Sequence, residues 1–242
     1  MPRPPDDAGV IAFIECYLAA HPRHGFDLMF ATASAAVMLP CGKTQLQRVY
    51  RMLGMNLPRR GKKRLPERVK TPLSVPDQPN QTWSMDFMLD SLDNGRKVRT
   101  FNVIDDFNRE ALKIEIDTSL PSQRVVRALD ELIHTRGAPK TIRSDNGPEF
   151  IAHVLSQWAI KNKVTLQFIE PGSPTQNAYI ERFNRTYRTE ILDCYIFGTT
   201  DELREITEPW RQHYNHERAH EALGGMPPVP YRINKFPKTF YF

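Results

Sequence analysis

The order of strand-like and helix-like segments between residues 83 and 216 restricts the fold of this 242-residue chain more than any other feature. Runs rich in aromatic and β-branched residues predict three strands, at 83–89, 99–107 and 111–117. Asp93-Asn94-Gly95 is a hairpin signal between the first two. Apolar spacing then predicts helices at 122–137, 149–162, 175–193 and 200–216, with strands at 140–145 and 164–170.

This order of elements gives the fold class. Three antiparallel strands followed by helix–strand–helix–strand–helix is the succession found in the ribonuclease H-like fold. We therefore expect residues 81–242 to form one α/β domain, a mixed five-stranded sheet flanked by helices, with a helical extension at its C-terminal end.

Residues 1–57 are expected to form a separate, small all-α domain. Apolar residues recur at helical spacing in three stretches, 10–20, 25–37 and 46–55. Pro40-Cys41-Gly42 predicts a tight turn before the last of them, which is basic and amphipathic. The pattern is helix-turn-helix-like and makes Arg48 and Arg51 candidate DNA contacts. A generic helical hairpin is the alternative interpretation.

A basic, proline-rich stretch at 58–80 has no periodicity and predicts an extended linker. Its cationic side chains are candidate phosphate contacts: Arg59, Arg60, Lys62, Lys63 and Arg64. A simple tether is the alternative. Residues 1–75 carry 12 Lys and Arg against 5 Asp and Glu, whereas residues 76–242 carry 21 against 23. Basic charge concentrated in one segment indicates a nucleic-acid partner.

Composition excludes several classes of protein. Hydrophobic residues make up 40% of the chain and charged residues 25%, as in ordinary globular domains. No stretch approaches the roughly 20 apolar residues of a membrane span, and the N-terminal segment does not resemble a signal peptide. Three separated cysteines predict neither a disulfide framework nor a zinc ribbon. We therefore expect a cytoplasmic, nucleoid-associated protein.

Three carboxylates are the candidate catalytic and metal-binding residues: Asp86, Asp145 and Glu181. Asp86 lies within a predicted strand, Asp145 ends another, and Glu181 opens a predicted helix. Carboxyl ends of strands are where ligands bind in open α/β sheets. Gathered acids repel one another unless a cation neutralises them, and all-oxygen ligation favours Mg²⁺ or Mn²⁺.

Several segments resemble insertion-sequence transposases of the retroviral integrase superfamily, in the group whose enzyme is encoded by two overlapping reading frames (the product of the second frame). They are WSMDF, DDFNRE, SDNGPEF, PGSPTQNAYIERFNRTYRTEIL and YNHERAHEAL, and the resemblance covers about 21–231. The group's pattern is Asp, Asp, then Glu after 35 residues, with Lys or Arg seven residues later. The matching positions here are Asp86, Asp145, Glu181 and Arg188.

The helix predicted at 175–193 has two different faces. Its polar residues recur at spacings of three or four, and we expect this face to carry the metal ligand and the phosphate contacts: Asn177, Glu181, Asn184, Arg185 and Arg188. Apolar residues on the other face should pack against the sheet: Ile180, Phe183, Tyr187 and Ile191. A solvated polar face is the alternative interpretation.

Other polar groups are expected to be structural. Asp105 and Asp106 fit turn-capping roles, with an accessory metal ligand as the alternative. Glu149 is expected to open a helix, where an acid is favoured by the helix dipole. His213, His216 and His220 are expected to belong to a C-terminal cap or a DNA contact rather than to a zinc site.

The resemblance implies a metal-dependent DNA transposase that cuts at the ends of a mobile element and joins the freed 3′-hydroxyl to target DNA. Its expected partners are double-stranded DNA, both terminal repeats and target, further copies of the chain, and an upstream-frame protein. A non-catalytic DNA-binding regulator and a ribonuclease H-like nuclease are the alternatives.

Overall fold

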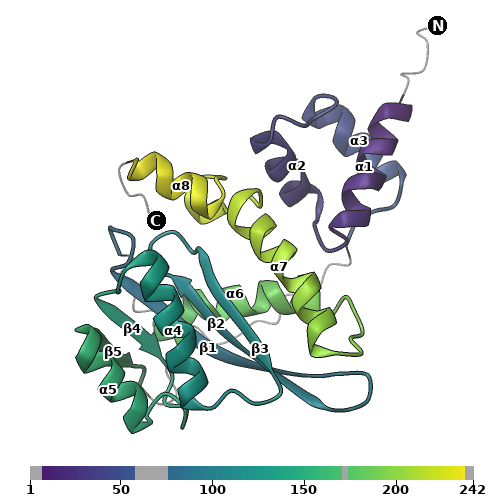
Figure 1. The fold of residues 1–242 in the computed structure, drawn as a ribbon. Helices are drawn as coiled ribbons and strands as arrows, with labels where there is room; N and C mark the ends of the chain where they lie inside the picture. Colours follow the sequence, from purple (N-terminus) through teal and green to yellow (C-terminus); the bar gives the residue numbers. More distant parts are fainter. Residues whose placement is uncertain (1–6, 58–75, 171–173, 238–242) are drawn as a thin grey trace, which may run out of the picture. The chain divides into compact units, whose positions relative to one another are not determined.

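The computed structural model describes residues 7–57, 76–170 and 174–237, and Figure 1 shows their elements. They form two compact units. The first comprises the described residues up to 57 and Glu217–Pro227, and the second comprises those from 76 to His216 and from Pro228 onward. Within the described residues, no helix has the length and apolar character that crossing a membrane requires.

The first unit is helical, as predicted. Its helices are α1 (Ala8–Ala20), α2 (Phe26–Ala35) and α3 (Lys43–Met52), and η3 (Glu221–Leu223) is a 3₁₀ turn. In α3 the fully buried residues are Leu46, Val49 and Tyr50, at the i, i+3, i+4 spacing of a single helix face. They pack with Ile14 and Met29 in the core of this unit.

The second unit is built on the predicted mixed five-stranded sheet, in the order β3-β2-β1-β4-β5. Its strands are β1 (Thr82–Ser91), β2 (Lys97–Asp105), β3 (Ala111–Asp117), β4 (Thr141–Ser144) and β5 (Thr165–Phe168). The first three pair antiparallel, whereas β4 runs parallel to both β1 and β5. This is the ribonuclease H-like arrangement expected from the order of elements.

Helices cover both faces of the sheet (Figure 1). They are α4 (Ser122–Arg136), α5 (His153–Asn162), α6 (Ala178–Tyr187) and α7 (Thr200–His216), and α8 (Pro228–Lys235) packs against α7. Trp83 and Met85 of β1 point to the core shared with α4 and α5. Met88 belongs to the core shared with α6 and α7. Each face therefore packs against an apolar core, and Asp86 of β1 and Asn102 of β2 are polar residues within the sheet.

Two predicted helices have different bounds in the structure, and one helix was not predicted. The helix expected at 149–162 begins only at His153, because residues 147–151 form a turn in which Phe150 and Ile151 donate to the carbonyl of Gly147. The helix expected at 175–193 is divided into a 3₁₀ turn η1 (Pro174–Asn177), the helix α6 and a π-helical turn η2 (Arg188–Leu192). Helix α8 was not predicted.

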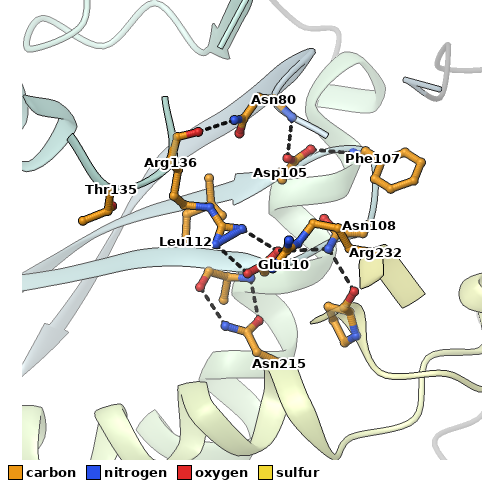
Figure 2. Close-up of polar contacts among 12 residues, drawn as sticks. Asn80, Asp105, Phe107, Asn108, Glu110, Leu112, Thr135, Arg136, Asn215 and Arg232 are labelled. Carbon is orange, nitrogen blue, oxygen red and sulfur yellow. Dashed lines mark hydrogen bonds and ion pairs between the residues drawn. The ribbon is translucent and has the colours of Figure 1, made fainter. Parts of the chain in front are cut away.

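A buried polar cluster fastens α8 to the sheet (Figure 2). Glu110, immediately before β3, forms ion pairs with Arg136 at 2.6 Å and with Arg232 of α8 at 3.1 Å. Asn108 donates to the carbonyl of Pro228 at 2.9 Å. Asn215 of α7 bonds both backbone groups of Ala111. The turn between β2 and β3 is therefore where the C-terminal helices attach.

Candidate active site

Asp86 lies in the middle of β1 with both carboxylate oxygens hydrogen-bonded. The amide of Phe87 donates to Oδ1 at 2.8 Å, and Asn184 Nδ2 donates to Oδ2 at 2.8 Å. Burial and the charges of Asp145 and Glu181 raise the pKa of Asp86 to about 6, although the hydrogen bonds from Phe87 and Asn184 act to lower it. Both acids therefore act electrostatically on Asp86, although the carboxylate oxygens of the three residues do not all lie within 4.8 Å of one another.

The parallel pairing of β1 with β4 brings Asp145 to Asp86. Ser84 is opposite Arg143 in this register. Asp86 follows Ser84 by two residues, and Asp145 follows Arg143 by two residues. Asp145 Oδ1 accepts from the amide of Gly147 at 3.0 Å. A Cβ atom at position 147 would lie 3.1 Å from that oxygen, so a glycine allows the loop to fold back on the carboxylate.

Glu181 reaches the site from the first turn of α6. The opposite face of this helix is buried through Ile180, Phe183 and Tyr187, as the apolar spacing predicted. Glu181 is exposed, and Asn184 lies one turn further along the same face, where it holds Asp86. The helix therefore supplies one carboxylate and the amide that orients another.

Asn102 is a site residue that sequence analysis missed. It is fully buried on β2 opposite Asp86, and its Nδ2 donates to Asn184 Oδ1 at 2.7 Å. The chain Asn102–Asn184–Asp86 fixes which amide atom faces the carboxylate, because an Asn184 oxygen that accepts from Asn102 leaves its NH₂ group to donate. The strand register could have identified it, but register is not visible in one sequence.

The donor set fits a hard divalent cation. Among the described residues, no Lys or Arg forms an ion pair with Asp86, Asp145 or Glu181. Three neighbouring acids without a positive partner, one of them with a raised pKa, are electrostatically unfavourable unless a cation is shared. Carboxylate oxygens from two strands and a helix are ligands of the kind that Mg²⁺ and Mn²⁺ prefer.

The other predicted contact residues are distributed around this centre and in the first unit. Arg188 donates to the carbonyl of Leu89 at 2.7 Å and pairs with Asp90 at 3.3 Å, both on β1. Asn177 is buried just before α6, whereas Arg185 is exposed on it. Arg48 pairs with Asp7 at 2.6 Å, and Arg51 is exposed. The predicted linker contacts lie outside the described residues: Arg59, Arg60, Lys62, Lys63 and Arg64.

The neighbouring acids have structural partners. Asp105 accepts from the backbone amides of Asn80 and Phe107, at 2.8 and 2.9 Å, which is the turn-capping role (Figure 2). Asp106 pairs with Arg143 at 3.0 Å. Glu149 does not open a helix, and this expectation is corrected. It pairs instead with Arg99 at 2.5 Å, and the Arg99 guanidinium holds the pKa of Glu149 below its usual value.

Comparisons with known proteins identify the family of the chain. Two models of the integrase core domain match residues 76–174 and 162–228. An uncharacterized protein of insertion element IS407 from Burkholderia multivorans is 44% identical over 184 residues, or 76% of this chain and 66% of the relative. An uncharacterized protein of insertion element IS476 from Xanthomonas euvesicatoria is 38% identical over 190 residues, or 78% of this chain and 55% of the relative.

A solved structure resembles the fold. It is a chain of the simian T-cell lymphotropic virus intasome in complex with PP2A regulatory subunit B56 gamma. The TM-score is 0.53 at 16% identity, over 89% of this chain and 70% of that chain. Of the two insertion-element relatives, this chain spans just under two thirds of the length of the IS407 protein and about half of the length of the IS476 protein.

Proposed function

This chain belongs to the integrase core domain family, and from that premise we propose that it is a DNA transposase. Its proposed reaction is metal-dependent cleavage of a phosphodiester at the end of a mobile element, followed by transfer of the freed 3′-hydroxyl into target DNA. The insertion-element relatives support this substrate class.

One observation carries the proposal. The partly buried Asp86 has its pKa raised to about 6, first by burial and then by Asp145 and Glu181, so three acids repel one another in a site without a paired Lys or Arg among the described residues. A protein keeps such an arrangement at a cost in stability, which is characteristic of functional sites. A sheet with a purely structural role would not need these three acids.

In the proposed mechanism each residue has a limited task. Asp86, Asp145 and Glu181 would hold Mg²⁺ or Mn²⁺, which when bound would activate a water or a 3′-hydroxyl and stabilise the departing oxygen. Asn184, oriented by Asn102, keeps Asp86 Oδ2 directed into the site. Arg185 and Arg188 are proposed to meet phosphate oxygens beside the reacting bond, and Asn177 is proposed to help position the DNA backbone.

The first unit and the basic linker are proposed to bind duplex DNA. Arg48 and Arg51 of α3 and the linker cations would contact phosphates, which attract cationic side chains regardless of base sequence. We further propose that several copies assemble on two element ends and that an upstream-frame protein assists them. The cytoplasmic nucleoid is the proposed location, since the substrate is there.

The test is a cleavage assay with Mg²⁺ and supercoiled DNA carrying candidate element ends. We expect the wild type to nick and join DNA, and Asp145→Asn to lose both activities while its thermal melting and DNA affinity stay nearly unchanged. Asp201→Asn, an exposed acid of α7, is the matched control and should remain active. Strand transfer by Asp145→Asn would exclude Asp145 as a metal ligand. DNA binding without cleavage by the wild type would favour the regulator, and cleavage restricted to RNA–DNA hybrids would favour the nuclease.

A further inference from the structure

The turn between β2 and β3 contacts every element that carries one of the three acids. It contains Asp106 and Arg109, two residues that the proposed mechanism does not use. Both lie in the DDFNRE segment, whose acids were predicted to cap turns. The contacts of these two side chains give the turn a second task.

Asp106 joins the turn to β1 and β4. Its backbone amide donates to the carbonyl of Thr82 at 3.0 Å, and its Oδ2 accepts from Arg143 at 3.0 Å. Burial raises the pKa of Asp106 to about 6, whereas the nearby Ser84 hydroxyl and the charge of Arg143 act in the opposite direction. Ser84 Oγ and Asp106 Oδ1 are buried and have no hydrogen-bond partner among the described residues. Asp106 and Arg143 are both buried, so this ion pair is a rigid link.

Arg109 joins the turn to α6. The centre of its guanidinium lies 3.5 Å from the ring centroid of Tyr179, within the range of a cation–π contact. Its backbone has φ of 62°, a left-handed conformation that is unfavourable for a residue with a Cβ atom. Such a conformation is retained where its surroundings impose it. The amide of Arg109 donates to the carbonyl of Asp105 at 2.8 Å, which fixes the start of its side chain.

These contacts share one spacing. Ser84 precedes Asp86 by two residues, Arg143 precedes Asp145 by two, and Tyr179 precedes Glu181 by two. In a strand, residues two apart are on the same face, so fixing the first directs the second. In a helix, residues two apart lie on nearly opposite sides. Holding Tyr179 against the turn therefore fixes the rotation of α6 and turns Glu181 away from the turn.

We propose that Arg109 is a positioning residue for the metal centre: by stacking on Tyr179 from a turn anchored through Asp106, it sets the rotation of α6 at which Glu181 meets Asp86 and Asp145. The inference rests on the proposed function, because the quantity that Arg109 controls is the convergence of metal ligands. Arg109 touches neither DNA nor metal in this role.

Arg109→Gly is the sharpest test, because glycine adopts the left-handed backbone without strain and only the side chain is removed. We expect the DNA-free variant to keep its circular dichroism spectrum and to bind Mn²⁺ about 10-fold more weakly by titration calorimetry, as when a metal site loses an outer partner. In the cleavage assay kcat should fall while KM for DNA is unchanged. Tyr179→Leu should give the same loss, and Tyr179→Phe, which keeps an aromatic ring, should restore most of the affinity.

Two comparisons make the result decisive. Combining Arg109→Gly with Tyr179→Leu should weaken Mn²⁺ binding no further than either change alone, since both remove the same stacking interaction. Arg204→Ala is the matched control, because it removes an arginine that holds the end of β3 in the same unit, and its Mn²⁺ affinity should be that of the wild type. If Arg109→Gly and Tyr179→Leu are folded and bind Mn²⁺ with wild-type affinity, the role of Arg109 is wrong but the proposed function is not affected. A wild-type protein that binds no Mn²⁺ and cuts no DNA would overturn the proposed function as well.

Discussion

Asp105 and Asp106 are adjacent buried acids whose carboxylates have different kinds of partner. Asp106 has a cationic partner in Arg143. Asp105, which is fully buried, depends mainly on two backbone N–H donors, those of Asn80 and Phe107. Burial raises the pKa of Asp105 to about 7, whereas those hydrogen bonds lower it. Ionisation of Asp105 near neutral pH therefore costs the folded turn stability.

This raised pKa predicts a pH dependence of folding. The folded pKa is above the unfolded value of about 3.9, so the folded state holds the proton more tightly and loses stability as pH rises from about 4 to about 7. Asp105→Asn cannot ionise and should lack this loss. We expect the unfolding free energy of the wild type, relative to the variant, to fall by about 2–3 kcal/mol between pH 5 and pH 8 in urea titrations. Parallel pH curves for the two proteins would contradict the assignment.

The site was predictable at the residue scale only in part. The three carboxylates were identified because spacing and strand context are written in the sequence. Asn102, the Arg99–Glu149 pair and the stacking of Arg109 on Tyr179 were not identified, since each joins elements through strand register or tertiary packing. Local periodicity fixes which face a residue occupies, but not which residue stands opposite.

Among the elements, α8 depends most on a single buried contact set. Arg232, 8% exposed, donates to Glu110 across 122 residues of sequence, and Asn108 bonds Pro228 at the start of the same helix (Figure 2). The helix has only eight residues and could not persist without tertiary packing. Its attachment therefore determines whether the helix forms at all.

Arg232→Ala should destabilise the second unit by about 2–4 kcal/mol, because it removes one of the two cations that neutralise the buried Glu110. Lys235→Ala, an exposed change on the same helix, should shift stability by less than about 0.5 kcal/mol. Urea unfolding monitored by fluorescence measures both. Equal effects of the two substitutions would mean that Arg232 contributes no more than a surface cation.

The elements that were predicted correctly have strong local patterns, and those that were missed do not. Alternation and apolar spacing located all five strands and the helices α1 to α4 and α7. The start of α5 was misplaced because the turn at Gly147 continues the apolar spacing of the helix. Pro228 and Pro230 made α8 resemble a loop, although both prolines fall in its first turn, where no backbone donor is needed.

For the whole molecule, the distribution of charge separates two tasks. Residues 1–75 carry an excess of positive charge, whereas the part with the carboxylates has slightly more acids than Lys and Arg. Phosphate attraction is therefore concentrated away from the sequence that supplies the acids. A chain so divided can be changed in DNA affinity without changing its chemistry.

Replacing Lys62, Lys63 and Arg64 by alanine in the full chain should weaken binding to all DNA sequences to a similar degree. The slope of log affinity against log salt concentration should also become shallower, by about 1 for each phosphate that is no longer neutralised. Fluorescence anisotropy at several salt concentrations measures this. Lys161→Ala, an exposed change on α5, should leave the slope unchanged. A triple variant with the wild-type slope would show that the segment is only a tether.

The long reach of the Glu110–Arg232 ion pair also affects how the protein is made. During translation, Glu110 is synthesised 122 residues before Arg232. Until the C-terminal segment has left the ribosome, Glu110 lacks Arg232, one of its two cationic partners. Asn108 also lacks its acceptor, the carbonyl of Pro228, and Ala111 at the start of β3 lacks its hydrogen bonds with Asn215. A nascent polypeptide stopped early would thus carry all three acids without the clamp that secures their scaffold. Chaperones and proteases would then meet it before DNA does.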